Sequence, residues 1–174
     1  IFVIRLAQGE LRASALVKSD RAPCGDHSFW PFLAVKVLGS RVSGLVVESD
    51  GTVWITGLAW PCDFPLTVPA AERALSSGTF LAGFTHDLTA VNFAALLSHG
   101  PLPSAVYPPQ MVLRRPGELA LAAASHPGGV EFAAFSTVSR TFTAQNGLNE
   151  TFGLSWLVAD GTGRLFAVVS RSNP

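Results

Sequence analysis

The stretch of sequence that decides the fold class is VSGLVVESDGTVWITGL, residues 42–58. Two runs rich in β-branched residues, 42–48 and 53–58, lie on either side of the pair Asp50-Gly51. An Asp-Gly pair readily adopts the positive φ angles of a tight hairpin turn, and β-branched residues favour extended backbone. This stretch therefore predicts an antiparallel β-hairpin.

Similar runs recur along the rest of the chain, separated by turn-forming residues. They predict further strands at 1–6, 11–17, 32–38, 110–113, 118–124, 130–143, 152–158 and 164–170. The expected connections include a loop at 20–28 and a break at 60–65, where prolines cannot donate to a strand ladder.

Two short helices are also predicted. Thr67 can cap the first, at 69–76, and Gly100 follows the second, at 87–98, whose apolar residues roughly fit a 3.6-residue period. Strands and helices do not alternate regularly, which disfavours a parallel doubly wound sheet. The expected fold class is mainly β: an antiparallel barrel-like or sandwich-like domain with one or two short helices.

The composition is that of one folded domain with few charges. The chain has 174 residues, of which 48% are hydrophobic and 14% are charged, and its formal net charge is zero. These values exclude a disordered tail and argue against a basic nucleic-acid-binding arm. Every long apolar run has a polar break, so membrane insertion is not expected either. Low charge instead favours association with other subunits.

The start of the chain and its cysteines add two expectations. The first residue is Ile1 and the single methionine is Met111, so we expect the chain to be part of a longer protein. Cys24 and Cys62 lie 38 positions apart, which matches no metal-binding spacing. Two cysteines are also too few for a disulfide scaffold.

A catalytic interpretation centres on His86-Asp87 combined with a serine. The stretch 153–157 comes nearest to the nucleophile motif Gly-x-Ser-x-Gly, but Ser155 lacks the second glycine and lies in an expected strand. We therefore expect Ser155 to be a strand residue and Asp87 a capping residue, and a small serine hydrolase using His86 is kept as an alternative. No metal-ligand spacing relates the other histidines, His27, His99 and His126. No catalytic, cofactor-binding or metal-binding residue is assigned.

Other polar and aromatic residues have both a binding and a structural interpretation. Arg114-Arg115 could hold an anion, but two basic residues beside Pro116-Gly117 are more typical of a solvated turn. Asn149 begins a formal N-glycosylation tripeptide. Tryptophans occur in carbohydrate sites, yet a position in or beside a strand favours a core role for all four, Trp30, Trp54, Trp60 and Trp156.

Residues 104–109 read SAVYPP, and residues 154–165 read LSWLVADGTGRL. These segments resemble two motifs of the protruding domain of norovirus-type calicivirus major capsid proteins, S-V-Y-P-P and the hairpin A-L-L-x-x-V-x-P-D-T-G-R-x-L. The distance between the two motifs is also similar to that in the family. Residues 43–65 resemble the family's strand, L-D-G-T turn and proline-rich exit.

The resemblance implies that residues 1–174 are a compact, divergent protruding domain of a longer capsid protein. Such a domain would form a homodimer about a two-fold axis and project from the capsid shell of a virion. It would serve host attachment, through a glycan or protein receptor, and antigenic display, with no active site and no cofactor. Only 41 residues separate Pro65 from Tyr107, so a reduced outer subdomain is expected around 66–106, and no receptor-binding residue carries over. The main alternative is a non-enzymatic β-rich interaction module of a cellular assembly.

Overall fold

The computed structural model describes residues 2–7, 10–16, 41–59, 67, 78–96, 109–125, 129–148 and 152–171. Within these ranges every regular element is a strand, which confirms the mainly β fold class. The strands are β1 (Phe2–Ala7), β2 (Glu10–Leu16), β3 (Arg41–Val47), β4 (Val53–Ala59), β5 (Gly78–Phe84), β6 (Val91–Leu96), β7 (Gln110–Arg115), β8 (Glu118–Ser125), β9 (Gly129–Ser136), β10 (Thr141–Leu148), β11 (Phe152–Ala159) and β12 (Leu165–Arg171).

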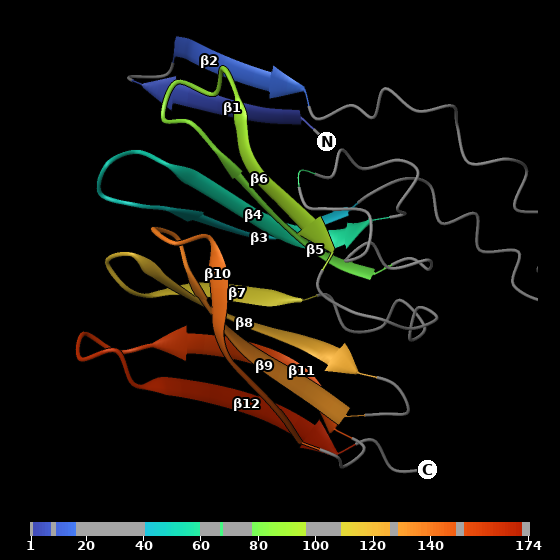
Figure 1. The fold of residues 1–174 in the computed structure, drawn as a ribbon. Coiled ribbons are helices and arrows are strands. Elements are labelled where there is room, and N and C mark those ends of the chain that lie inside the picture. Colours follow the sequence, from blue (N-terminus) through green and yellow to red (C-terminus); the bar gives the residue numbers. More distant parts are fainter. Residues whose placement is uncertain are drawn as a thin grey trace, which may run out of the picture.

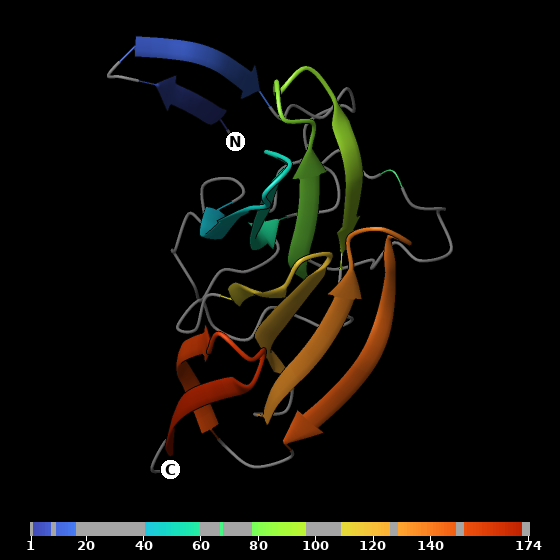
Figure 2. The same cartoon turned by 90° about the vertical axis from the view of Figure 1, so that its left-hand side faces the viewer.

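The strands form antiparallel sheets that are stacked in layers. One four-stranded sheet has the order β3-β4-β5-β6 and the other has the order β10-β9-β8-β7. The pairs β1-β2 and β11-β12 form two-stranded sheets, and Figures 1 and 2 show them at opposite ends of the stack. The described strands thus form an open, layered arrangement, and they do not close into a barrel.

The hairpin expected at 42–58 is present as β3 and β4. Val47 pairs with Val53 and Leu45 pairs with Ile55, while Gly51 in the connecting turn has a φ of 87°. That φ lies in the left-handed region, which glycine enters without a steric penalty. A bulge between Val42 and Gly44 shifts the register of β3.

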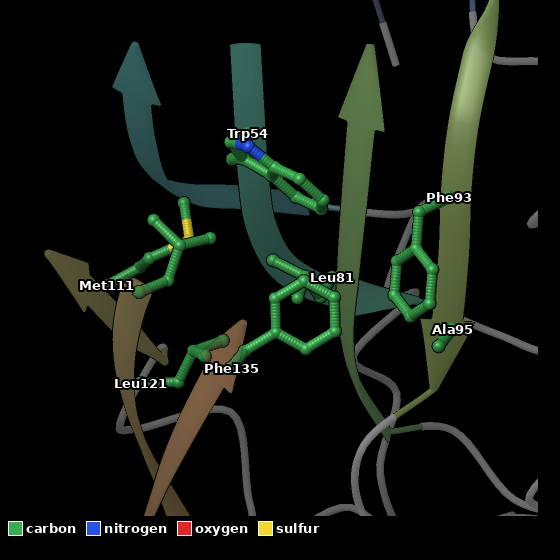
Figure 3. Close-up of a cluster of buried hydrophobic side chains, with 8 residues drawn as sticks. Trp54, Leu81, Phe93, Ala95, Met111, Leu121 and Phe135 are labelled. Atoms are coloured by element: carbon green, nitrogen blue, oxygen red, sulfur yellow. The ribbon is translucent and has the colours of Figure 1, made fainter. Parts of the chain in front are cut away.

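A hydrophobic core fills the space between the two four-stranded sheets. Trp54, from β4, lies 5.3 Å edge-on from Phe135, measured between ring centroids, and Phe93 lies 4.9 Å from the same Phe135 ring. Such edge and tilted contacts suit the quadrupoles of aromatic rings. Figure 3 shows side chains from both sheets converging on this cluster, which comprises Trp54, Leu81, Phe93, Ala95, Met111, Leu119, Leu121 and Phe135.

A second, smaller cluster joins the sheet β7–β10 to the β11-β12 hairpin. Leu157 of β11 packs against the opposite face of that sheet, where Ala120, Ala122 and Val130 are buried. Alternate residues of β8 therefore serve the two clusters, because side chains alternate between the faces of a strand. Small alanines on this face let the hairpin approach closely.

The helix predicted at 87–98 is wrong over its described part. Residues 91–96 form β6, and Leu88, in the preceding turn, has a φ of 60°, which a right-handed helix cannot contain. Both faces of β6 are covered, since Phe93, Ala94 and Ala95 are 6%, 0% and 5% exposed. An apolar run without alternation imitates a helical period. The helix predicted at 69–76 lies outside the described residues.

Two further differences from the expected elements concern β9–β10 and β5. The single strand predicted at 130–143 is two strands, β9 and β10, because a turn at residues 137–140 reverses the chain. β5 was not predicted, although both of its faces are buried. The other described strands match their predictions to within a few residues. The strand at 32–38, the loop at 20–28 and the break at 60–65 lie outside the described residues.

Candidate functional site

Five hairpin turns lie at one end of the stacked sheets (Figure 1). They join β3 to β4, β5 to β6, β7 to β8, β9 to β10 and β11 to β12. Their proximity is also evident in their contacts, since a Cβ on Gly51 would lie 3.0 Å from the Cβ of His86 in the β5–β6 turn. This end is called the turn face below.

Glu48 holds three of these turns together. Its Oε2 accepts a hydrogen bond from the Trp54 indole nitrogen at 2.8 Å. Its Oε1 accepts hydrogen bonds from the Gly117 backbone nitrogen at 3.2 Å and from the Thr137 hydroxyl at 3.0 Å. One half-buried carboxylate therefore links the β3–β4, β7–β8 and β9–β10 turns. Glu48 lies beside the predicted Asp50-Gly51 turn, but no local pattern indicates that it would bond to turns 69 and 89 residues away.

Three turns share an Asp-x-Thr pattern in which the aspartate bonds the threonine two residues later. Asp160 Oδ1 accepts hydrogen bonds from both the backbone nitrogen and the hydroxyl of Thr162, at 2.9 and 2.7 Å. Asp50 and Asp87 bond the threonines that follow them in the same way. Such local bonds stiffen short turns. Asp87 is thus a turn residue, which corrects its expected role as a helix cap.

The hydrogen bonds of these turns also stabilise the ionised aspartates. The Thr162 hydroxyl and the Arg164 guanidinium lower the pKa of Asp160 to about 2. The hydroxyls of Thr85 and Thr89 lower the pKa of Asp87 to about 2 as well. Hydrogen bonds donated to a carboxylate favour its charged form.

A polar cleft of about 440 Å³ opens between the turns. Glu48, Asp50 and Thr137 line it together with Asn92 and Arg140. The guanidinium of Arg140 donates to the Asn92 carbonyl oxygen at 3.0 Å, which ties the β9–β10 turn to β6. The polar groups of the cleft largely bond one another, so their evident role is to fix the positions of the turns.

Arg114 and Arg115 share one carboxylate. Glu118 accepts hydrogen bonds from Arg114 Nη1 at 2.6 Å and from Arg115 Nε at 2.8 Å. Burial raises the pKa of Glu118, but the bonds from Arg115 and Arg114 outweigh this effect and lower it. Arg114 Nε also donates to the Gly163 carbonyl oxygen at 2.8 Å, which connects the β7–β8 and β11–β12 turns. The pair lies beside a solvent-exposed turn, as expected, with the Arg114 and Arg115 side chains 38% and 67% exposed, and it also holds this turn to the β11–β12 turn.

The outer face of the β11-β12 hairpin is apolar and exposed. Trp156 is 66% exposed, Val158 50%, Phe166 52% and Val168 56%. These four residues, called the outer quartet below, share a face because Trp156 pairs with Val168 and Val158 pairs with Phe166. The guanidinium of Arg164 lies over the Phe166 ring, 6.0 Å from its centroid, at the rim of the quartet.

The predicted core role of tryptophan holds for Trp54 and fails for Trp156. Trp54 is 2% exposed and belongs to the main core. In β11 the core position is taken by Leu157, which is 4% exposed, and the neighbouring Trp156 points to the opposite face. A two-stranded hairpin has one covered face here, so alternation alone sends the indole outward. Trp30 and Trp60 lie outside the described residues.

His86 and Ser155, the serine in the nearest match to the nucleophile motif, lie in different layers. His86 is in the β5–β6 turn, while Ser155 is at a bulge of β11, beyond the sheet β7–β10. Among the described residues, no group of three or more His, Cys, Asp or Glu side chains could hold a metal ion. The other singled-out positions lie outside the described ranges: Cys24, His27, Cys62, His99, Tyr107, His126 and Asn149.

The two segments that carry the family resemblance are described to different extents. Only Pro109 of residues 104–109 is described; it is buried, and its carbonyl oxygen accepts a hydrogen bond from Ser43 at 2.6 Å. Residues 154–165 form the β11–β12 hairpin, with the turn closed by Asp160. In the part of the chain that the structure describes, no helix is long and apolar enough to cross a membrane.

Comparison of the chain with family models, with curated proteins and with solved structures gave no match. The sequence motifs and the geometry of two surfaces, the turn face and the outer quartet, are therefore what indicate the function of this chain.

Proposed function

We propose that this chain is a non-catalytic structural domain, the surface spike of an icosahedral viral capsid. In this role it would act as a dimer on the virion surface, in host-cell attachment and in antigenic display. The observation that carries the proposal is the hairpin at 154–165, whose sequence resembles the protruding-domain motif and whose outer face is an exposed apolar quartet. An exposed patch of this kind is typical of a surface that meets another protein.

The turn face supports the display part of the proposal. Its turns are short and polar, and Glu48 and the Asp-x-Thr bonds hold them in fixed positions. A rigid set of surface turns can be recognised by a receptor or an antibody with little loss of conformational entropy. The receptor class proposed is a host glycan or protein, and no residue is assigned to it.

Electron microscopy of the full-length parent protein tests this function. We expect assembled particles with surface projections, and we expect an antibody raised against this chain to decorate those projections. Particles with a smooth shell would overturn the proposal, as would a parent protein that forms no shell. The second result would favour an interaction module of a cellular assembly.

A fluorophosphonate probe tests the enzymatic alternative directly. A spike domain should show no labelled serine after incubation with the probe, whereas labelling of a serine that requires His86 would contradict the non-catalytic proposal. His86→Ala provides the matched control for that requirement.

A further inference from the structure

The outer quartet has an alternating arrangement of large and small side chains. Trp156 lies opposite Val168 across the hairpin, and Val158 lies opposite Phe166. In sequence order Trp156 precedes Val158 along β11. Phe166 likewise precedes Val168 along β12, which runs antiparallel to β11. The two rings therefore occupy one diagonal of the quartet and the two valines occupy the other.

This diagonal arrangement is complementary to itself. A second copy placed face to face about a two-fold axis parallel to the strands brings each Trp156 onto the partner's Val168 and each Phe166 onto the partner's Val158. An axis perpendicular to the strands, in the plane of the interface, pairs Trp156 with the partner's Val158 instead. In both cases every ring meets a valine, which is how facing layers interdigitate without voids.

The size of the quartet fits a modest homodimer. An aromatic side chain offers roughly 150–250 Å² of surface, so the two half-exposed rings offer roughly 250 Å². With the two half-exposed valines the quartet offers roughly 400 Å², as large as the main patch of a typical monomer. Two copies would cover about 800 Å² through the quartet, and rim residues would bring the area to the roughly 1,000 Å² of a specific interface. Arg164, whose guanidinium lies over the Phe166 ring, provides part of this rim.

Charge does not oppose such pairing. The formal net charge of each copy is zero, so two copies approach without net repulsion. The charged group at the rim, Arg164, is already paired with Asp160 at 2.7 Å, and the quartet itself contains no charge.

We propose that the outer quartet of β11 and β12 is the homodimer interface of this protein, with a second copy of the chain as its occupant. The expectation of a dimer rests on the proposed function, and the new inference is which surface forms that dimer. The two-fold contact is isologous, so each copy contributes both a ring and the valine that receives the partner's ring.

Sedimentation velocity of the 174-residue chain over a range of concentrations tests the interface. We expect a reversible dimer, and we expect Trp156→Asp to weaken it by about 30-fold or more, as truncation of a central interface tryptophan does. Leu45→Asp is the matched control, because Leu45 is 58% exposed on β3, away from the quartet, and should leave the dimer unchanged. A wild-type chain that stays monomeric, or a dimer lost in Leu45→Asp alone, would overturn the inference.

Val158→Trp separates a specific interface from a merely adhesive surface. This variant enlarges the apolar patch, but its new ring would face the partner's Phe166 when the two-fold axis is parallel to the strands and the partner's Trp156 when it is perpendicular. Two rings would then compete for the same space, so we expect weaker dimerisation. Tighter association of this variant would contradict the alternating arrangement. Circular dichroism checks that each variant is folded, and Val158→Thr, which keeps the shape of valine, should still dimerise measurably.

The outcomes for the interface and for the proposed function are distinguishable. A monomeric chain whose parent still forms labelled projections would remove the interface and leave the spike function standing. If the chain dimerises through the quartet but its parent forms no shell, the spike function is removed and the interface stands.

Discussion

The indole nitrogen of Trp54 donates a hydrogen bond to Glu48 Oε2 at 2.8 Å, and this bond connects the main core to the turn face. Trp54 is 2% exposed, and its ring packs on Phe93 and Phe135. Glu48 in turn accepts bonds from the β7–β8 and β9–β10 turns of the other sheet. The positions of three turns therefore depend on one carboxylate.

Replacing Glu48 should destabilise the protein more than its half-buried position suggests. Glu48→Ala leaves the buried indole N–H and the Gly117 N–H without acceptors, at a cost of about 2–3 kcal/mol in the free energy of unfolding. Glu48→Gln keeps the side-chain volume but turns an amide donor toward one of these donors, so a smaller loss is expected. Urea unfolding measures both changes. Ser49→Ala, an exposed change in the same turn, should have little effect, and equal losses for all three variants would contradict this role for Glu48.

Gly83 should not tolerate even a methyl group. It pairs with Trp54 across β4 and β5, and a Cβ at this position would lie 2.7 Å from the indole Cζ3. The indole is held by its core contacts, so Gly83→Ala is expected to cost about 1–3 kcal/mol through overpacking. Thermal unfolding measures this loss. Gly161→Ala is the control, because nothing lies within 4 Å of its added Cβ, and a similar loss in that variant would argue against overpacking.

The β11–β12 turn should weaken in acid. The folded pKa of Asp160, about 2, is lower than its ordinary value of 3.8, so its ionised form stabilises the fold. This contribution is fully present above the unfolded pKa and is lost as the pH falls through the interval from 3.8 to about 2. We expect the difference in urea midpoint between the wild type and Asp160→Asn to be largest near neutral pH and to shrink toward pH 2. A difference that does not vary with pH would contradict the prediction.

Arg114 should stabilise the β11–β12 turn, although it is 49 residues away from Gly163 in the sequence. Its Nε donates to the Gly163 carbonyl oxygen, so Arg114→Ala is expected to accelerate amide hydrogen exchange at residues 162–164 several-fold. Arg115→Ala is a close control, because it also removes a bond to Glu118 but leaves the contact with Gly163 intact. Equal acceleration in both variants would assign the effect to Glu118 instead.

The local sequence was enough to predict most of the described strands. At 42–58 and 154–165, β-branched and apolar runs flank an Asp-Gly turn, and both segments form hairpins. Local chemistry decides here because a tight turn selects residues by φ, and the turn then aligns the two strands next to it. The helix predicted at 87–98 failed because burial on both faces of β6 removed the alternation that marks a strand.

The sequence by itself thus determined the strand class, the main turns and the absence of net charge. Only the tertiary structure decided that Trp54 is buried while Trp156 is exposed, and that Glu48 meets Gly117 and Thr137, 69 and 89 residues away. The physical reason is that alternation sorts side chains onto two faces, whereas the packing of layers decides which face is covered. Contacts between turns likewise depend on how distant hairpins stack, which no local pattern encodes.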